Sequence, residues 1–384
     1  MAEDDKIRIY HLADTHLGYS AYRKVDSDGV NQREKDIYNA FVRAIDHIVE
    51  TKPDLVLHAG DLFDTVRPTN RAISVAMEQL IRLSKEKIPT VIVAGNHETP
   101  KLRETGHVFK LFDHLDYIYP VYNDKKETFQ FNIEGKKVSV HAVPHCRDKE
   151  EFTKALKDAM PDASSDYNIL VTHGAVQAIQ IFKMNEFNEY IIPFSMISKG
   201  FDYVALGHYH KHVKIRENVV YSGSTERLSF TEAGDEKGLV EIELGSFIFQ
   251  RFHSIPTRRM IDLEPIDCKG LTNREIVEEI KNAVKNRDIK DAIVRLSLIN
   301  IDSSTYRSLD AKSIKSVFSD ALHFEIKHSI GRDIEQLEIP GTPIGDLLTE
   351  FERFMEKASC RNKSTILELG KKYIQRAQAE REEK

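Results

Sequence analysis

The chain has 384 residues, of which 41% are hydrophobic and 30% are charged, and its formal net charge is −6. This composition is typical of a folded globular protein and excludes a long disordered chain, while the length suggests two or three domains. The acidic balance argues against a nucleic-acid binder that is basic over its whole surface, so a polyanionic substrate would need a local basic patch or metal ions.

The sequence also indicates the environment of the chain. Its start, residues 1–6, is polar and acidic, unlike a secretory signal peptide, and no apolar run approaches the roughly 20 residues that span a bilayer. Cys146, Cys268 and Cys360 are far apart and form no C-x-x-C pair, which favours free thiols over disulfides or a thiolate metal site. We therefore expect a cytoplasmic protein that does not enter a membrane.

From residue 6 to residue 243, short apolar runs alternate with segments of helical periodicity. The predicted buried strands are residues 7–12, 55–57, 91–93, 169–171 and 204–206. The predicted helices are marked by apolar residues at helical spacing: Ile37, Phe41, Ile45 and Ile48; Ala72, Ala76, Leu80 and Leu83; Val108, Leu111, Phe112 and Leu115. A hairpin at residues 129–133 and 138–143, followed by mostly short strands over residues 213–252, favours a four-layer α/β/β/α sandwich over a simple doubly wound sheet.

Two short segments that contain proline predict domain boundaries. Residues 256–259 (Pro-Thr-Arg-Arg) end the first domain, residues 1–255, and a strand–helix–strand–helix–strand pattern then predicts a small α+β domain over residues 256–338. Residues 340–343 (Pro-Gly-Thr-Pro) open a helical tail, residues 339–384. The tail has two apolar runs: Leu347, Leu348, Phe351, Phe354 and Met355, then Ile366, Leu367, Leu369, Tyr373 and Ile374.

Short motifs rich in aspartate, histidine and asparagine directly follow the predicted strands. They are Asp14-Thr15-His16, Gly60-Asp61, Gly95-Asn96-His97-Glu98, Thr172-His173-Gly174 and Gly207-His208-Tyr209-His210. Because strands of an open sheet place their carboxyl ends along one edge, where ligands bind, these distant motifs are expected to converge. The sequence therefore predicts one site built from all five motifs.

The residue types in these motifs are those of a divalent metal site. Carboxylate and amide oxygens suit hard cations, and imidazole suits first-row metals such as manganese, iron and zinc. Asp61 has two oxygens and can bridge two ions, and such a pair can catalyse phosphoryl transfer. His97, which follows a ligand without being one, is suited to stabilise the transition state or to protonate the leaving oxygen. Glu98 and Asp64 are equally compatible with helix-capping or loop roles.

The ordered series D-x-H, G-D, G-N-H-[DE], H and G-H-x-H resembles that of the calcineurin-like metallophosphoesterases. Within them the chain looks like the DNA double-strand-break repair nucleases, called SbcD in bacteria and Mre-eleven in archaea and eukaryotes, and most like the archaeal members. The more specific matches are residues 11–19 (HLADTHLGY), 59–64 (AGDLFD) with Arg67-Pro68, 205–211 (ALGHYHK) and 221–227 (YSGSTER).

The resemblance implies a metallophosphoesterase sandwich, a capping DNA-binding domain and an ATPase-binding tail. It makes Asp14, His16, Asp61 and His210 ligands of one Mn²⁺, makes Asp61, Asn96, His173 and His208 ligands of a second, and assigns catalysis to His97. The chain departs from the family pattern at Asp64, where many archaeal and eukaryotic members have histidine, and at Glu98, where aspartate is commoner.

The resemblance further implies a nucleoid-associated homodimer that works with an SMC-like ABC ATPase, called SbcC or Rad-fifty. The expected activities are duplex-end exonuclease and single-strand or hairpin endonuclease. Alternatives are a phosphatase or nucleotide phosphodiesterase on the same scaffold, or a DNA-bridging scaffold with incidental catalysis. Predicted DNA contacts are the basic residues Arg23, Lys24, Arg67, Lys101 and Arg103, and predicted dimer contacts are Ile73, Met77, Leu111, Phe112 and Leu115.

Overall fold

The computed structural model describes residues 6–177, 189–197, 199–330, 351, 355 and 363–382. The chain divides into two compact units, Met1–Ile330 and Gly331–Lys384. The sequence places domain boundaries at 255/256 and 338/339, and both stay predictions.

The first sheet has the strand order β14-β13-β1-β2-β3-β4. Four of its strands are parallel: β1 (Ile7–Leu12), β2 (Leu55–His58), β3 (Thr90–Val93) and β4 (Ile118–Val121). The hairpin of β13 (Gly238–Leu244) and β14 (Phe249–Ser254) extends this sheet antiparallel to β1. The carboxyl ends of β1, β2 and β3 therefore lie next to one another.

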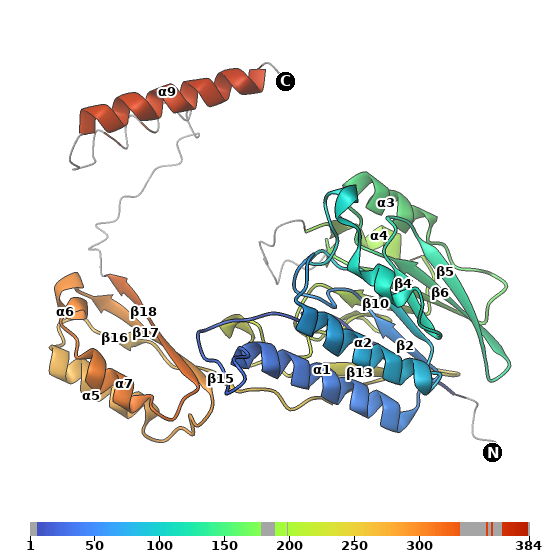
Figure 1. The fold of residues 1–384 in the computed structure, drawn as a ribbon, viewed down its shortest axis with the longest axis horizontal. Coiled ribbons are helices and arrows are strands. Elements are labelled where there is room, and N and C mark those ends of the chain that lie inside the picture. The colour runs from blue at the N-terminus through green and yellow to red at the C-terminus, as the bar shows by residue number, and fades with distance from the viewer. Residues whose placement is uncertain are drawn as a thin grey trace. The chain divides into compact units, whose positions relative to one another are not determined.

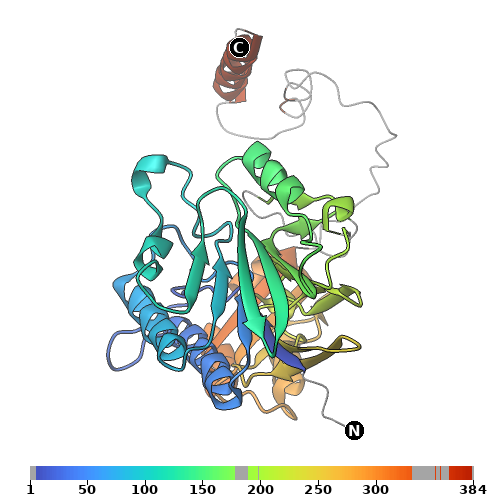
Figure 2. The same cartoon turned by 90° about the vertical axis from the view of Figure 1, so that its right-hand side faces the viewer.

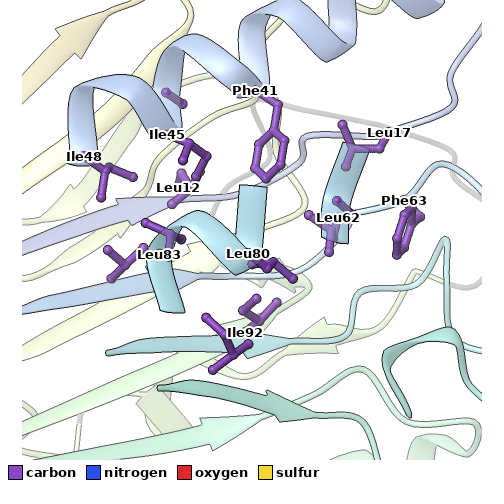
Figure 3. Close-up of a cluster of buried hydrophobic side chains, with 14 of the residues drawn as sticks. Leu12, Leu17, Phe41, Ile45, Ile48, Leu62, Phe63, Leu80, Leu83 and Ile92 are labelled. Carbon is purple, nitrogen blue, oxygen red and sulfur yellow. The ribbon is translucent and has the colours of Figure 1, made fainter. Parts of the chain in front are cut away.

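Helices α1 (Gln32–Thr51) and α2 (Asn70–Lys85) cover one face of this sheet (Figure 1). Side chains cap both helices, since Asn31 accepts hydrogen bonds from Arg33 N and Glu34 N, and Thr69 accepts one from Ala72 N. Apolar side chains of the helices meet those of the sheet in a buried cluster (Figure 3), in which Phe41 and Ile45 of α1 lie with Leu12 of β1. Burying each such side chain contributes about 1.5–3 kcal/mol.

The second sheet has the strand order β11-β12-β10-β7-β6-β5. Strands β6 (Lys136–Val143), β7 (Tyr167–His173), β10 (Tyr203–Gly207) and β12 (Val219–Tyr221) are parallel, and β5 (Glu127–Ile133) and β11 (Val213–Arg216) are antiparallel edges. Helices α3 (Lys149–Asp158) and α4 (Phe194–Ile197) pack on its outer face. Strands β8 (Ala175–Val176) and β9 (Ile191–Ile192) pair in parallel and form a separate two-stranded sheet.

A fully apolar layer joins the two sheets face to face. It contains Ile9 and Leu57 from the first sheet and Val140, Ile169 and Ala205 from the second. The strands stand between helices α1 and α2 on one side and α3 on the other (Figure 2). The predicted four-layer α/β/β/α sandwich is therefore confirmed.

Residues 260–330, here called the small module, form a third sheet with its own hydrophobic cluster. Strand β17 (Ile293–Ile301) pairs in parallel with β15 (Met260–Asp262), β16 (Ile266–Asp267) and β18 (His323–Ile330). The module also contains α5 (Asn273–Val284), α6 (Ser303–Arg307) and α7 (Ala311–Val317). A capping box, Thr272 with Glu275, begins α5.

One predicted helix is wrong. Instead of an α-helix over residues 108–115, the chain forms a short 3-10 turn, η2 (Val108–Phe112), which follows another, η1 (Arg103–Thr105). The buried side chains of η2 are Phe109 and Phe112, which lie three residues apart, so a 3-10 turn places both on the core. A further 3-10 turn, η3 (Phe230–Glu232), interrupts the strands predicted over residues 213–252.

In the second unit, helix α9 (Lys363–Glu382) contains the apolar run predicted at 366–374. The ring of Phe351 lies so close to Gly370 that a Cβ there would come within 2.2 Å of it. The run at residues 347–355 lies outside the described residues except for Phe351 and Met355. None of the helices that the structure describes is both long and apolar enough to cross a membrane.

Candidate metal centre

The five motifs meet where strands of both sheets end. Leu12 of β1 is in register with His58 of β2, so the two strands end level and Asp14 N donates a 3.0 Å hydrogen bond to Gly60 O. In the second sheet, Gly207 of β10 is in register with His173 of β7. His173 Nδ1–H donates to Ala59 O at 2.9 Å, which links the edges of the two sheets.

Asp61, Asn96, His173 and His208 form one half of the cluster. His173 Nε2 lies 3.2 Å from Asp61 Oδ2 and 2.8 Å from Asn96 Oδ1. His208 Nδ1 lies 3.3 Å from the same Asn96 oxygen. These side chains come from four separate strand ends, and the structure brings them together as the sequence predicted.

Asp14, His16 and His210 form the other half, again around Asp61. His16 Nε2 lies 3.1 Å from His210 Nε2 and 3.7 Å from Asp61 Oδ2. Both Asp14 oxygens accept from His208 N, at 2.9 and 3.0 Å, and Asp14 Oδ1 lies 3.8 Å from His173 Nδ1. Asp61 thus lies within 4 Å of histidines from both halves.

The backbone is strained at these positions. Asp14, Asp61 and His16 have φ of 53°, 53° and 44°, and His208 has φ of 110°. A non-glycine residue in this left-handed region costs on the order of 1–3 kcal/mol, and such residues gather at functional sites. This strained backbone lowers the stability of the fold, and it directs the four side chains toward a common point.

The glycines of the motifs allow the close approach. A Cβ added at Gly60, where φ is +95°, would lie 2.3 Å from His173 Nδ1. A Cβ at Gly95 would lie 2.1 Å from Asp61 Oδ1. Neither motif tolerates a side chain at its glycine without moving the ligand-type residue beside it.

The donor set fits a divalent metal. Asp61 Oδ2 is buried, makes no hydrogen bond of regular geometry with any described residue, and lies 3.2 Å from His173 Nε2 and 3.7 Å from His16 Nε2. His16 Nε2 and His210 Nε2 face each other at 3.1 Å, an arrangement that a cation between imidazoles and carboxylates accounts for. Asp14, Asp61 and His173 present ligand atoms within 4.8 Å of one another.

The electrostatics of the site also suit a cation. Burial by itself would lower the pKa of His173, but the carboxylates of Asp61 and Asp14 raise this pKa to about 9. Burial would raise the pKa of Asp61, but the neighbouring histidines hold it well below its ordinary value. The buried carboxylates thus create a negative field that stabilises positive charge.

His97 lies at the mouth of the site. Its Nδ1–H donates to Asp64 O at 2.9 Å, and its backbone N–H donates to Asp61 Oδ1 at 3.0 Å. Its ring meets that of His16 edge-on, with centroids 4.6 Å apart. His97 also lines a cavity of about 850 Å³, together with Arg67 and Lys101.

Glu98 and Asp64 take different places in this arrangement. Glu98 is fully buried, and its Oε1 accepts from Gly95 N at 2.9 Å and from Leu62 N at 3.4 Å, so it ties the Asp61 and Asn96 loops together. Burial raises the pKa of Glu98 to about 8. Asp64 Oδ1 lies 3.3 Å from His16 Nδ1 and 3.8 Å from His97 Nδ1, which places its carboxylate beside the site.

Two outer carboxylates were missed from the sequence. Glu232 Oε1 lies 3.2 Å from His210 Nδ1, and Glu189 Oε1 lies 3.4 Å from His208 Nε2. Glu232 ends the short turn η3 and Glu189 lies in a loop, so neither belongs to a periodic strand or helix pattern that would have marked it in the sequence. Histidine ligands commonly donate their second N–H to a carboxylate, so the sequence indicates that such partners exist but not which residues they are.

The predicted DNA contacts do not all line one cavity. Arg67 and Lys101 line the cavity of His97, whereas Lys24 lines a second cavity of about 660 Å³ with Lys312 and Lys315 of the small module. Arg23 is exposed, and the side chain of Arg103 is outside the described part of the structure.

The predicted dimer contacts differ in exposure. Phe112 is fully buried and stacks on Phe63 in the core of its own chain, so its assignment to a dimer surface is wrong. Ile73, Met77 and Leu115 are partly buried against the same core. Leu111 is 47% exposed and remains available for an interface.

Comparison with known proteins agrees with the predicted resemblance. The profile of a family described as Calcineurin-like phosphoesterase matches residues 7–212, more than half of the chain. The DNA double-strand break repair protein Mre11 of Methanocaldococcus jannaschii is 35% identical over 234 residues, 59% of this chain and 58% of that protein. The Mre11 protein of Methanococcus maripaludis is 32% identical over 243 residues, 60% of each chain.

The similarity extends further in another relative. The Mre11 protein of Methanosarcina acetivorans is 27% identical over 373 residues, which cover 88% of this chain and 56% of that protein. The chain thus spans less than two thirds of the length of these three relatives.

Proposed function

The chain belongs to the calcineurin-like phosphoesterases, and from this premise we propose that it is a manganese-dependent DNA nuclease of double-strand-break repair. The observation that supports this most is the complete set of ligand-type side chains around Asp61, in a chain similar to Mre11 proteins. The proposed reactions are exonuclease cleavage at duplex ends and endonuclease cleavage of single strands or hairpins.

We assign the metal ligands in two sets that share Asp61. Asp14, His16, Asp61 and His210 would hold one Mn²⁺, and Asp61, Asn96, His173 and His208 the other. When bound, the two ions would activate a water molecule and neutralise charge on the attacking and leaving oxygens. The contacts of both halves with Asp61, at 3.7 Å from His16 and 3.2 Å from His173, support a bridging role.

His97 is the proposed catalytic side chain. Because Nδ1–H donates to Asp64 O at 2.9 Å, the ring is held in one orientation and Nε2 is the nitrogen that can exchange a proton. In the imidazolium form, Nε2–H would donate to the leaving oxygen as the phosphodiester bond breaks. Asp64 here takes the place of the histidine that many archaeal relatives have.

The substrate is proposed to be DNA because cationic side chains border the cavity at His97. Arg67 and Lys101 line that cavity and suit phosphate oxygens, which carry most of the affinity for DNA without sequence specificity. Arg23, Lys24 and Arg103 stay proposed contacts. These basic side chains would give a chain of net charge −6 the local positive patch that it needs to bind a polyanionic substrate.

We further propose the partners that the resemblance implies: a second copy of this chain and an SMC-like ABC ATPase bound by residues 339–384. Helix α9 presents Ile366, Leu369 and Tyr373 at 42%, 49% and 68% exposure, as a docking helix would. The alternative, that the tail folds back onto its own nuclease domain, stays open. A DNA-repair role places the protein at the nucleoid.

One assay separates this function from its closest alternative. Purified full-length protein with Mn²⁺ is offered labelled duplex DNA, labelled single-stranded DNA and p-nitrophenyl phosphate. We expect cleavage of both DNAs and little release of nitrophenol. Efficient release of nitrophenol without DNA cleavage would instead establish a phosphatase, the reading that the acidic net charge of −6 favours. Metal binding without any hydrolysis would favour the DNA-bridging scaffold.

A further inference from the structure

A buried ion pair lies directly behind the candidate ligand His210. Glu232 Oε1 is 3.2 Å from His210 Nδ1, and Glu232 Oε2 accepts a 2.6 Å hydrogen bond from Lys237 Nζ. Glu232 is 7% exposed and Lys237 is 1% exposed, so little water screens the interaction. A charged pair at this depth needs good geometry to be tolerated, which restricts where both side chains can lie.

The pair holds His210 by its ring and by its backbone. Lys237 Nζ also donates to His210 O at 2.7 Å and to Ser224 Oγ at 3.0 Å. The carboxylate of Glu232 accepts the Nδ1–H of His210, so it fixes the tautomer that leaves Nε2 for a metal and makes that nitrogen more basic. His210 Nε2 faces His16 Nε2 at the centre of the site, as this arrangement requires.

Glu232 belongs to a turn that also contacts the small module. It ends η3, and Phe230 begins the same turn. Phe230 is buried with Met260 of β15 and Ile293 of β17, and the guanidinium of Arg295 lies 4.5 Å from the centre of its ring. Within three residues, one end of η3 therefore faces the metal ligand and the other end faces the small module.

The joint between the sandwich and the small module is tied to the same loop. Arg258 N donates to Glu226 Oε2 at 3.1 Å, and Arg227 Nη1 donates to Arg258 O at 3.3 Å. Arg258 also forms an ion pair with Asp36 of α1. A displacement of the small module would therefore be transmitted to the loop that carries Glu232.

We propose that Glu232 is a positioning residue for the metal centre, and that η3 makes the affinity of the ion held by His210 depend on how the small module is seated. This rests on the proposed ligand role of His210 but does not depend on the substrate. The small module would then regulate metal loading in addition to any contact that it makes with DNA.

The role of Glu232 is tested by titrating the full-length chain with Mn²⁺, following bound and free ion by electron paramagnetic resonance. Glu232→Gln keeps the size of the side chain but removes its charge. It should lower the affinity for one of the two ions about 10- to 100-fold and leave the affinity for the other unchanged. Glu232→Asp retains the charge and should recover part of the affinity. The spectrum of the remaining bound ion distinguishes a lost site from a general loss of folding.

Glu241→Gln is the matched control. Glu241 is 8% exposed and accepts a 2.6 Å hydrogen bond from His253, so the substitution removes a similar carboxylate–histidine contact elsewhere in the fold. Its Mn²⁺ binding should equal that of the wild type. If Glu232→Gln binds both ions with wild-type affinity, or if the wild-type chain binds no Mn²⁺, the proposal is wrong.

The link to the small module is tested separately. Arg295→Met removes the cation over the ring of Phe230, and Phe230→Leu replaces that ring, which packs on Met260, with a smaller side chain. Each substitution should lower the affinity for the same ion as Glu232→Gln does. Lys281→Met is the control, since Lys281 pairs with Glu278 on the exposed side of α5 in the same module, at 2.7 Å. Unchanged Mn²⁺ affinity in both test variants would overturn the coupling. These titrations remain decisive if the wild type binds Mn²⁺ but does not cut DNA, which would refute only the proposed function.

Discussion

At the scale of single residues, Asp61 shows most clearly how the fold serves the site. It follows β2 with φ of 53°, it is fully buried, and it lies between histidines of both halves of the cluster. Burying a carboxylate among several histidines, on a strained backbone, is unfavourable for stability alone. A bridging metal ligand explains both features together.

His97 gives a test that separates chemistry from metal binding. Its side chain is not one of the proposed ligands, so His97→Ala should retain both Mn²⁺ ions while the single-turnover rate of DNA cleavage falls by about 10²- to 10⁴-fold. His114→Ala, at an exposed histidine, is the control and should cut DNA at the wild-type rate. Loss of a Mn²⁺ ion from the His97 variant would make His97 a ligand instead.

His107 predicts a pH dependence of stability. Burial lowers its pKa to about 4, and His107 Nδ1 accepts a hydrogen bond from Phe109 N at 3.1 Å. In the unfolded chain its pKa returns to about 6.5. Between these values only the unfolded chain takes up the proton, so stability is complete above about pH 6.5 and falls as the pH drops toward 4.

The substitution that checks this is His107→Asn, which keeps an acceptor for Phe109 N but cannot be protonated. The melting temperature of the variant should fall less between pH 6.5 and pH 4.5 than that of the wild type. Part of the slope should remain, because burial also lowers the pKa of His11 and of His58 to about 3. Identical slopes for the two proteins would contradict the assignment.

At the scale of elements, the buried strands were the most predictable part of the chain. The run at residues 7–12 is β1 without adjustment, and the runs at 55–57 and 204–206 each lie within the observed strand. Parallel strands buried on both faces appear as continuous apolar runs, so pattern alone identifies them. Polar residues directly after such runs then had to lie at a sheet edge, which is why the convergence of the motifs was foreseeable.

Other elements could not be predicted, for identifiable reasons. Helix α3 has only Phe152, Ala155 and Leu156 buried in ten residues, too few for its periodicity to stand out. The turn η2 uses a three-residue spacing that resembles α-helical periodicity over so short a segment. Glu232 and Lys237 are joined by tertiary contacts that sequence spacing does not show.

The close packing of the strand-end loops leads to a prediction at this scale. A Cβ at Gly95 would lie 2.1 Å from Asp61 Oδ1 and 2.4 Å from Asp61 N, so Gly95→Ala must displace the proposed bridging carboxylate. We expect this variant to lose measurable Mn²⁺ binding by calorimetry. Gly245→Ala is the control, because a Cβ at Gly245 would make only ordinary contacts, the nearest being Lys6 at 3.6 Å. Full Mn²⁺ binding by the Gly95 variant would show that Asp61 need not stay in place.

At the scale of the whole molecule, the proposed dimer depends on the surface near η2. Leu111 is 47% exposed there, and Leu111→Asp should shift the protein from dimer to monomer in light scattering. Met160→Asp, at a residue that is 54% exposed near the end of α3, should leave the dimer intact. A Leu111 variant that stays dimeric would move the interface elsewhere.

Mn²⁺-dependent cleavage of labelled DNA by the wild-type chain and by Asp61→Asn directly tests whether Asp61 serves two metal ions. The substitution keeps the shape of the side chain but removes the charge that would serve both ions. We expect the wild type to cleave DNA until the metal is chelated, and we expect no detectable cleavage by a folded Asp61→Asn protein. Cleavage by that variant at a rate near that of the wild type would rule out a two-metal mechanism that depends on Asp61.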